Sequence, residues 1–289
     1  MSEPGLVVVD KPGAMTSHDV VARVRRLAGT RKVGHAGTLD PMATGVLVVG
    51  VDRATRLLGH LTLTEKAYDA TVRLGAATTT DDAEGEVLSR ASVAHLTEDD
   101  VRSAAGAFVG RIEQQPSAVS AVKVEGKRAY ARVRAGEQVE LPTRTVTVHE
   151  LVVTDVRVGD EHVDLDLTLR CSSGTYVRAI ARDLGRALGT GGHLTALRRT
   201  AVGPFTLDDA HPLDDLAGSF DVLPLADVAR RCFPTYELSA EQAVDVGFGR
   251  RLAADLGAEG PVALLDADGR FLALYEQRGD LAAAVAVFT

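Results

Sequence analysis

Apolar and polar residues alternate along three stretches of the chain, and each stretch predicts a β-strand. From Lys66 to Leu74 an apolar residue recurs at every second position, which predicts a strand with one buried face. Residues 145–158 and 162–171 alternate in the same way on either side of Gly159 and Asp160, so they predict an antiparallel hairpin. Residues 45–51 are apolar without alternation, which predicts a strand buried on both faces.

Helical spacing of apolar residues appears between these stretches. After Ser17, which we expect to be the N-cap, apolar residues recur at helical spacing until Gly29. Residues 97–108 begin with a Thr-x-x-Asp cap and predict a second helix. A third is expected after residues 172–175, capped by Ser or Thr and ended by Gly189. Hairpin-paired strands interrupted by single helices favour the α+β class, with a mixed, mostly antiparallel sheet flanked by helices.

The chain changes character near residue 205. Residues 205–234 are acidic and contain three prolines, as a linker or a peripheral helix and loop would. Residues 239–242 (SAEQ) then form a capping box, and short apolar runs follow around the turn at Asp268 and Gly269. We therefore expect a large domain over residues 1–234 and a small β-rich domain over residues 235–289.

The composition indicates a cytoplasmic protein without a bound metal. The N-terminal residues lack the basic and apolar regions of an export signal, and the longest apolar run, residues 46–51, is too short to span a membrane. Cys171 and Cys232 are too far apart in sequence for a zinc motif, and the eight histidines show neither HxH nor HExxH spacing.

Basic and acidic residues are unevenly distributed along the chain, so the net charge alone does not describe its surface. A net charge of −8 weighs against a nucleic-acid partner, because phosphate neutralisation needs a basic surface. However, residues 1–60, 111–144 and 170–203 are net positive, whereas residues 204–289 are strongly acidic. Such asymmetry is typical of a protein with one basic face, although solvated helix faces also produce it.

A single acid stands in the loop GHAGTLDPMATG, residues 34–45. The proline after Asp40 restricts the backbone of the acid, and the glycines allow another chain or a ligand to approach closely. A generic Asp-Pro turn only uses its carboxylate to cap a backbone amide. This loop is longer than such a turn and joins two apolar strands, where binding loops are commonly located. Asp40 is therefore our candidate for a rigidly held, exposed carboxylate.

A second group, Thr175, Tyr176 and Arg178, lies where the third helix is expected to begin. A helix N-terminus attracts anions and a guanidinium suits a carboxylate, so an acid bound there would stay ionised. Taken singly, Tyr176 and Tyr68 equally suit core aromatic positions, and Arg178 equally suits a surface charge. Two tyrosines beside an acid and an arginine could instead stack a flat ring.

A third group extends from residue 115 to residue 137 and places basic residues around Tyr130. These basic residues are Lys123, Lys127, Arg128, Arg132 and Arg134. The pattern is typical of an element that contacts phosphates, and it is equally typical of a solvated helix.

Taken in order, five segments resemble the bacterial TruB family, the pseudouridine synthases that act on uridine 55 in the T loop of tRNA. The segments are VDKPGAMTSHDVV, GHAGTLDPMATGVLVVGV, KAYDATVRLG, QQPSAVSAVKVEGKRAYARVRAGE and CSSGTYVRAIARDLGRALGTGGHLTALRRTAVG. The resemblance covers residues 6 to about 205. It implies the pseudouridine synthase fold, with a curved sheet crossed by an active-site cleft, and it extends only loosely, as a PUA-like domain, into the C-terminal residues.

The resemblance also implies roles for particular residues. Asp40 corresponds to the catalytic aspartate, Arg178 to its arginine partner, and Tyr68 to the tyrosine that stacks on the target base and removes a proton from C5. His35 corresponds to the histidine associated with flipping the nucleotide. Lys11, Tyr176 and Leu197 match residues around the same cleft, and residues from about 111 to 145 match an insertion that folds over RNA.

These expectations define a leading hypothesis and two alternatives. The leading hypothesis is an enzyme that isomerises a uridine in the T stem-loop of tRNA as a monomer, without a cofactor or a membrane. The first alternative is a noncatalytic tRNA-binding or tRNA-folding module with the same surface. The second is an aspartyl-phosphate enzyme that uses Asp40, although the loop lacks the second acid that would bind Mg²⁺.

Overall fold

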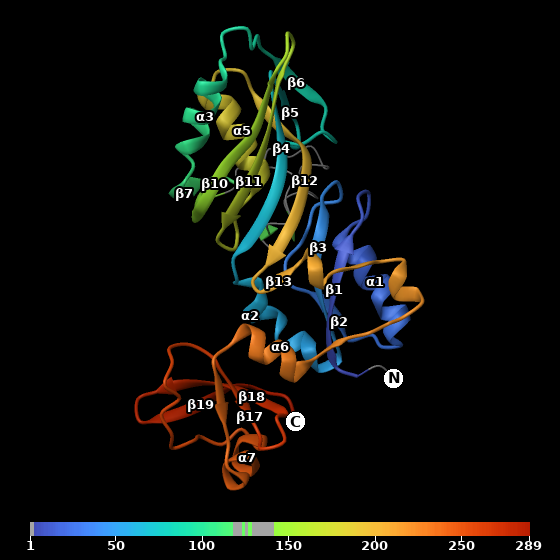
Figure 1. Cartoon of the computed structure of the whole chain (residues 1–289), viewed down its shortest axis with the longest axis vertical. Helices are drawn as coiled ribbons and strands as arrows, with labels where there is room; N and C mark the ends of the chain where they lie inside the picture. The colour runs from blue at the N-terminus through green and yellow to red at the C-terminus, as the bar shows by residue number, and fades with distance from the viewer. Residues whose placement is uncertain (1–2, 118–122, 125–126, 129–141) are drawn as a thin grey trace. The chain divides into compact units, whose positions relative to one another are not determined.

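The computed structural model describes residues 3–117, 123–124, 127–128 and 142–289. The chain forms two compact units (Figure 1). Unit 1 comprises residues 1–40, 46–62 and 203–289, and unit 2 comprises residues 41–45 and 63–202.

Unit 1 begins with a strand, a helix and a pair of strands. Its first elements are β1 (Gly5–Lys11), α1 (Ser17–Ala28), β2 (Val33–His35), β3 (Thr44–Val51), the short 3-10 helix η1 (Asp52–Arg56) and α2 (Leu58–Thr62). β1 lies between β3 and the short strand β14 (His211–Pro212), and β2 pairs antiparallel with β3. The apolar face of α1 packs on Val7, Val9, Leu47 and Val49 of β1 and β3, which forms the core of this part.

The remainder of unit 1 holds a separate small sheet. The segment before this sheet contains β13 (Phe205–Thr206), η2 (Leu207–Asp209), η3 (Asp215–Ala217), β15 (Leu223–Pro224) and α6 (Leu225–Cys232). The elements that follow are β16 (Thr235–Glu237), α7 (Ala240–Gly247), β17 (Val262–Leu265), β18 (Phe271–Arg278) and β19 (Leu281–Val287). The small sheet has the strand order β16-β17-β18-β19 and its own apolar core around Tyr275. The predicted capping box is confirmed, because Ser239 and Gln242 cap α7 reciprocally.

Unit 2 is an antiparallel sheet with helices on one face. Its elements are β4 (Lys66–Leu74), β5 (Ala76–Thr78), β6 (Val87–Arg90), α3 (Glu98–Gly106), β7 (Gly110–Gln114), β8 (Lys123–Val124), β9 (Lys127–Arg128), β10 (Arg144–Val158), β11 (Val163–Cys171), α5 (Val177–Ala187) and β12 (Gly192–Val202). The strands follow the order β12-β4-β11-β10-β7, each antiparallel to its neighbours. α3 and α5 cover one face of this sheet (Figure 1).

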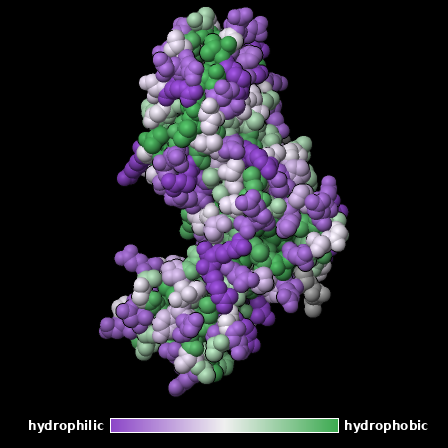
Figure 2. Space-filling model, viewed as in Figure 1, coloured by the Kyte–Doolittle hydropathy of each residue, from purple (hydrophilic) through white to green (hydrophobic). Residues whose placement is uncertain are grey.

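The structure confirms the α+β class and the main periodic elements. The predicted hairpin is β10 and β11, β3 is buried, and β4 buries Tyr68, Ala70, Val72 and Leu74 as its alternation requires. The visible surface is mostly hydrophilic with scattered apolar residues (Figure 2). Among the described residues, the exposed large apolar side chains include Leu63, Leu88 and Phe248.

Candidate active site

The loop that carries Asp40 is anchored on α1. Asp40 is half-buried, and Leu39 before it is buried. The Ser17 hydroxyl accepts a hydrogen bond from the Leu39 N–H at 2.9 Å and donates one to the Leu39 carbonyl at 3.0 Å. The prediction that Ser17 is the N-cap is wrong, because Thr16 accepts from the Asp19 N–H and so begins α1 one residue earlier. This frees the Ser17 hydroxyl to bind the loop.

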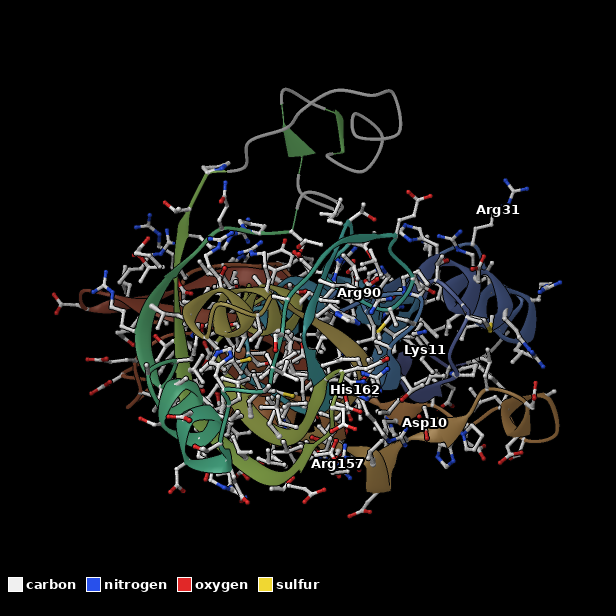
Figure 3. All side chains as sticks on the ribbon, turned by 90° about the horizontal axis from the view of Figure 1, so that it is seen from above. Asp10, Lys11, Arg31, Arg90, Arg157 and His162 are labelled. Atoms are coloured by element: carbon white, nitrogen blue, oxygen red, sulfur yellow. The ribbon has the colours of Figure 1, made fainter. Side chains whose placement is uncertain are left out.

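Two other predicted site residues, Lys11 and His35, also belong to unit 1. Lys11, labelled in Figure 3, is the last residue of β1 and is fully buried. Its ammonium group donates to the carbonyls of Pro12 at 2.8 Å and Met15 at 2.7 Å, so it fixes the turn that leads into α1. His35, the last residue of β2, meets His18 edge to face with ring centroids 5.5 Å apart.

The other end of the Asp40 loop joins the sheet of unit 2. Thr44 and Gly45 pair in parallel with Arg198 and Arg199 of β12, and Arg198 donates to the Thr44 hydroxyl at 3.2 Å. Gly45 has φ = +99°, and a Cβ there would lie 2.2 Å from the Arg199 carbonyl oxygen. The close approach that Gly45 permits is therefore to a neighbouring strand.

Tyr68 and Leu197 share one face of the unit 2 sheet. Tyr68 of β4 lies opposite Arg199 on β12 and opposite Leu169 on β11, and only 7% of its surface is exposed. Leu197 lies opposite Ala70, one step along the same face. A buried ring beside an apolar side chain is a suitable surface for a flat heterocycle.

Lys66 adds an unusual charge to this face. It precedes Tyr68 by two residues, is buried, and donates to the Thr64 carbonyl at 2.9 Å. Burial, assisted by the charge of Arg199, lowers the pKa of Lys66 from 10.5 to about 8.

The lowered pKa of Lys66 predicts a pH-dependent stability. Between pH 8 and 10.5 the unfolded chain binds a proton at Lys66 that the folded chain has lost, so the free energy of unfolding rises with pH in this window. We expect Lys66→Met to remove that rise and to stabilise the fold by about 1–3 kcal/mol at pH 7. Urea unfolding of both proteins from pH 7 to pH 10.5 measures the difference. Parallel curves for the two proteins would contradict the prediction.

The start of α5 is fixed by a side chain from another strand. The expected Ser or Thr cap is wrong, because the N-cap is Tyr176, which makes no side-chain cap bond. Instead, Gln114 at the end of β7 accepts from the Tyr176 N–H at 2.7 Å and donates to the Tyr176 carbonyl at 3.0 Å. The Arg144 guanidinium lies 5.2 Å from the centroid of the Tyr176 ring, a cation–π distance. Backbone and ring of Tyr176 are thus both held.

Gln114 should therefore contribute measurably to stability. Gln114→Leu leaves a donor and an acceptor of Tyr176 without these bonds, and we expect a loss of about 1–3 kcal/mol in the free energy of unfolding. Chemical denaturation measures the loss. Gln115→Leu is the matched control, since position 115 is exposed, and it should change stability by less than about 0.5 kcal/mol. Equal stability of the two variants would show that the pair of bonds contributes nothing.

Arg178 is buried in the first turn of α5, where it meets the acidic turn between β5 and β6. Its guanidinium donates to the Thr80 carbonyl at 2.8 Å and lies 3.4 Å from the Asp82 carboxylate. Asp82 is itself held, since it accepts from the Thr80 hydroxyl and from the Glu84 N–H. Arg178 is 5% exposed, and such a cation requires carboxylate and carbonyl partners.

A second arginine, one helical turn further along α5, binds the same turn. Arg182 lies 3.3 Å from Asp81 and 2.9 Å from Asp183, and it donates to the Gln115 carbonyl at 2.8 Å. Burial raises the pKa of Asp81, while the charge of Arg182 opposes that rise. The acidic turn is therefore attached to α5 through two arginines.

The predicted site residues are divided between the two units. Lys11, His35 and Asp40 belong to unit 1, whereas Tyr68, Tyr176, Arg178 and Leu197 belong to unit 2. Of the basic element, the structure gives only the backbone of Lys123 in β8 and of Lys127 and Arg128 in β9, which form a small antiparallel pair. Arg132 and Arg134 lie outside the described residues.

From the sequence we predict no part in the site for several residues that hold these side chains. Ser17, Gln114 and Arg182 act on residues distant in sequence, so no local pattern indicates these contacts. Within the described ranges no helix is both apolar and long enough to cross a bilayer. In the same part of the chain no three His, Cys, Asp or Glu side chains are grouped as a metal site would need.

Comparison with known proteins gives the class of this fold and site. Residues 25–177 match the TruB family pseudouridylate synthase N-terminal domain, residues 178–223 the tRNA pseudouridylate synthase B C-terminal domain, and residues 233–289 the C-terminal domain of tRNA pseudouridine synthase II. A solved Cbf5-Nop10-Gar1 complex contains a chain that is 26% identical, with a TM-score of 0.74 over 99% of this chain and 85% of that one. An H/ACA ribonucleoprotein bound to a substrate RNA containing 2′-deoxyuridine gives the same TM-score at 24% identity, covering 99% of this chain and 85% of that one. The fold is that of the pseudouridine synthases.

Closer relatives define the family. The tRNA pseudouridine synthase B of Thermobifida fusca is 59% identical over 288 residues, 98% of each chain. That of Nocardia farcinica is 58% identical over 284 residues, 98% of this chain and 92% of the relative. The chain belongs to the TruB family, and its activity is that of a tRNA pseudouridine synthase, an isomerase.

Proposed function

We propose that the chain converts uridine 55 in the T loop of tRNA to pseudouridine, with Asp40 as the nucleophile acting on a flipped-out base. The observation that carries this proposal is the match to relatives named tRNA pseudouridine synthase B over 98% of this chain. The order of the matching sequence segments and the rigid attachment of the Asp40 loop support it.

The chemistry needs only well-placed side chains. The bond from N1 of uracil to the ribose C1′ breaks, the base turns, and a bond forms between C5 and C1′. C5 then loses its proton and N1 gains one, so the reaction is an isomerisation without redox change. A carboxylate nucleophile, directed at C6 of the base or at C1′, is sufficient for this sequence. We therefore propose that no cofactor takes part.

Each site residue has a role in this proposal. Arg178 pairs with the Asp40 carboxylate and orients it, and Tyr68 stacks on the extracted uracil and takes the proton from C5. His35 assists extraction of the nucleotide, which costs a few kcal/mol of stacking. Lys11 and Tyr176 shape the surroundings of the site, and Leu197 packs beside the base.

The basic residues around Tyr130 provide the RNA contacts in this proposal. Lys123, Lys127, Arg128 and Arg132 contact phosphates of the T stem-loop.

Residues 1–234 form the catalytic domain and residues 235–289 a small domain. This boundary is supported by the separate four-stranded sheet, which begins at β16, and by the separate family match over residues 233–289. We propose that a monomer is the active species.

The test is an assay on a T-arm hairpin that includes the loop and a stable stem. The protein is incubated with the hairpin without added metal or nucleotide, and pseudouridine is mapped at each position. We expect product at the position equivalent to uridine 55 only, and none when that uridine is replaced by cytidine. Tight binding of the hairpin without any product would favour the noncatalytic tRNA-binding module.

A further inference from the structure

Ser17 makes a reciprocal contact with the backbone of Leu39. Its side chain accepts from the Leu39 N–H at 2.9 Å and donates to the Leu39 carbonyl at 3.0 Å, across 22 residues of sequence. Ser17 is 1% exposed and Leu39 is 3% exposed, so water does not compete for these bonds. One hydroxyl therefore satisfies both polar backbone groups of a buried residue.

The helix itself does not need this hydroxyl. Thr16 caps α1 by accepting from the Asp19 N–H at 3.1 Å, and the Asp19 carboxylate accepts from the Thr16 N–H at 2.9 Å. This capping box already binds the backbone N–H groups of Thr16 and Asp19. The Ser17 hydroxyl is directed instead at the loop, which is a use that helix formation does not explain.

The contact acts directly next to the proposed nucleophile. Leu39 precedes Asp40, so fixing both backbone groups of Leu39 fixes the peptide that leads to Asp40. The proline at position 41 restricts the backbone of Asp40 from the other side. With its neighbours held on both sides, the Asp40 carboxylate has few backbone arrangements available. Such precision matters because a reacting group displaced by about 1 Å can lose on the order of 10²-fold in rate.

We propose that Ser17 is a positioning residue, which holds the Asp40 carboxylate in its reactive place through the backbone of Leu39. This inference rests on the proposed function, in which Asp40 is the nucleophile. In this proposal α1 contributes to catalysis as well as to the apolar core.

The test compares two variants of adjacent residues at the start of α1. Ser17→Ala removes the contact with Leu39, whereas Thr16→Ala removes a cap of the same helix that does not touch the loop. We expect both to lower the thermal midpoint. We expect only Ser17→Ala to lower kcat, by about 10-fold to 100-fold, with KM and tRNA affinity within about threefold of the unaltered protein. A purely structural role would reduce kcat equally in both variants, or in neither.

A third variant protects the test against misfolding. Ser17→Cys keeps the shape and a weak donor and acceptor, so kcat should lie between those of Ser17→Ala and the unaltered protein. Asp40→Asn, measured in parallel, tests the proposed function separately from the positioning role of Ser17. If Asp40→Asn stays active, the proposed function fails; if it is inactive while Ser17→Ala keeps full kcat, only the positioning role of Ser17 is overturned.

Discussion

Replacing Asp40 by Asn is expected to lower turnover by about 10⁴-fold or more, while tRNA affinity stays within about tenfold, or about 1.4 kcal/mol. The amide has nearly the shape of the carboxylate, but it is a poor nucleophile. Because the loop is held at Leu39 and at Thr44, the substitution should leave its backbone in place. Single-turnover formation of pseudouridine in a T-arm hairpin measures the rate, and equilibrium titration of the same hairpin measures the affinity.

Asp69→Asn is the matched control for this prediction. Asp69 follows Tyr68 on β4 and is exposed on the opposite face of the strand, so it should keep turnover within about threefold. Comparable losses in both variants would point to a general effect of charge on RNA binding. Full turnover by Asp40→Asn would remove the carboxylate from the mechanism altogether.

Arg178→Lys is expected to lower turnover by about tenfold to 10²-fold, corresponding to about 1.4–2.8 kcal/mol. Lysine keeps the positive charge but loses the planar fork, which can serve the Thr80 carbonyl, Asp82 and a nucleophilic carboxylate at once. In the proposed mechanism this leaves the Asp40 carboxylate less well aligned. The measurement is again single-turnover product formation, at several pH values between 5.5 and 8.

The chain supplies a close control in Arg182, one turn further along α5. Arg182→Lys disturbs the same acidic turn through Asp81, yet it should affect stability more than turnover. If the two lysine variants lose turnover to the same extent, the effect belongs to the attachment of the acidic turn, and the special role of Arg178 is refuted.

The elements that the sequence predicted well are those whose burial follows a local period. β4 buries every second residue, and α1 buries Val20, Val21 and Val24 at helical spacing before Gly29 ends it. β11 also buries every second residue, so the pairing of the hairpin was predictable, although two register shifts interrupt the alternation of β10. In each case the environment of a residue is decided by its position within its own element.

The features that sequence reasoning missed depend on contacts between distant segments. α5 begins at Tyr176 because Gln114, 62 residues away, binds the Tyr176 peptide groups, and no local capping residue indicates this. Ser17 suits an N-cap on local grounds, but the Thr16–Asp19 capping box takes that role, and the Ser17 hydroxyl binds Leu39, 22 residues away. The pairing of Arg178 with the acidic turn likewise joins residues nearly a hundred positions apart.

β12 has no simple alternation because two β-bulges interrupt it. The register shifts between Leu194 and Ala196 and again between Arg199 and Ala201. Between the bulges, Leu197 and Arg199 lie opposite Ala70 and Tyr68, on the buried face of β4. Each bulge exchanges the inward and outward positions of the strand, so a period of two cannot be read across it.

The bulges of β12 also restrict how this part of the chain can diverge. A side-chain replacement at Leu197 alters one contact, whereas the gain or loss of one codon between the bulges would turn every following side chain to the opposite face. Leu197 and Arg199 would then exchange places with the less buried residues beside them. Among homologous genes, this segment should accumulate point changes but almost no insertions or deletions.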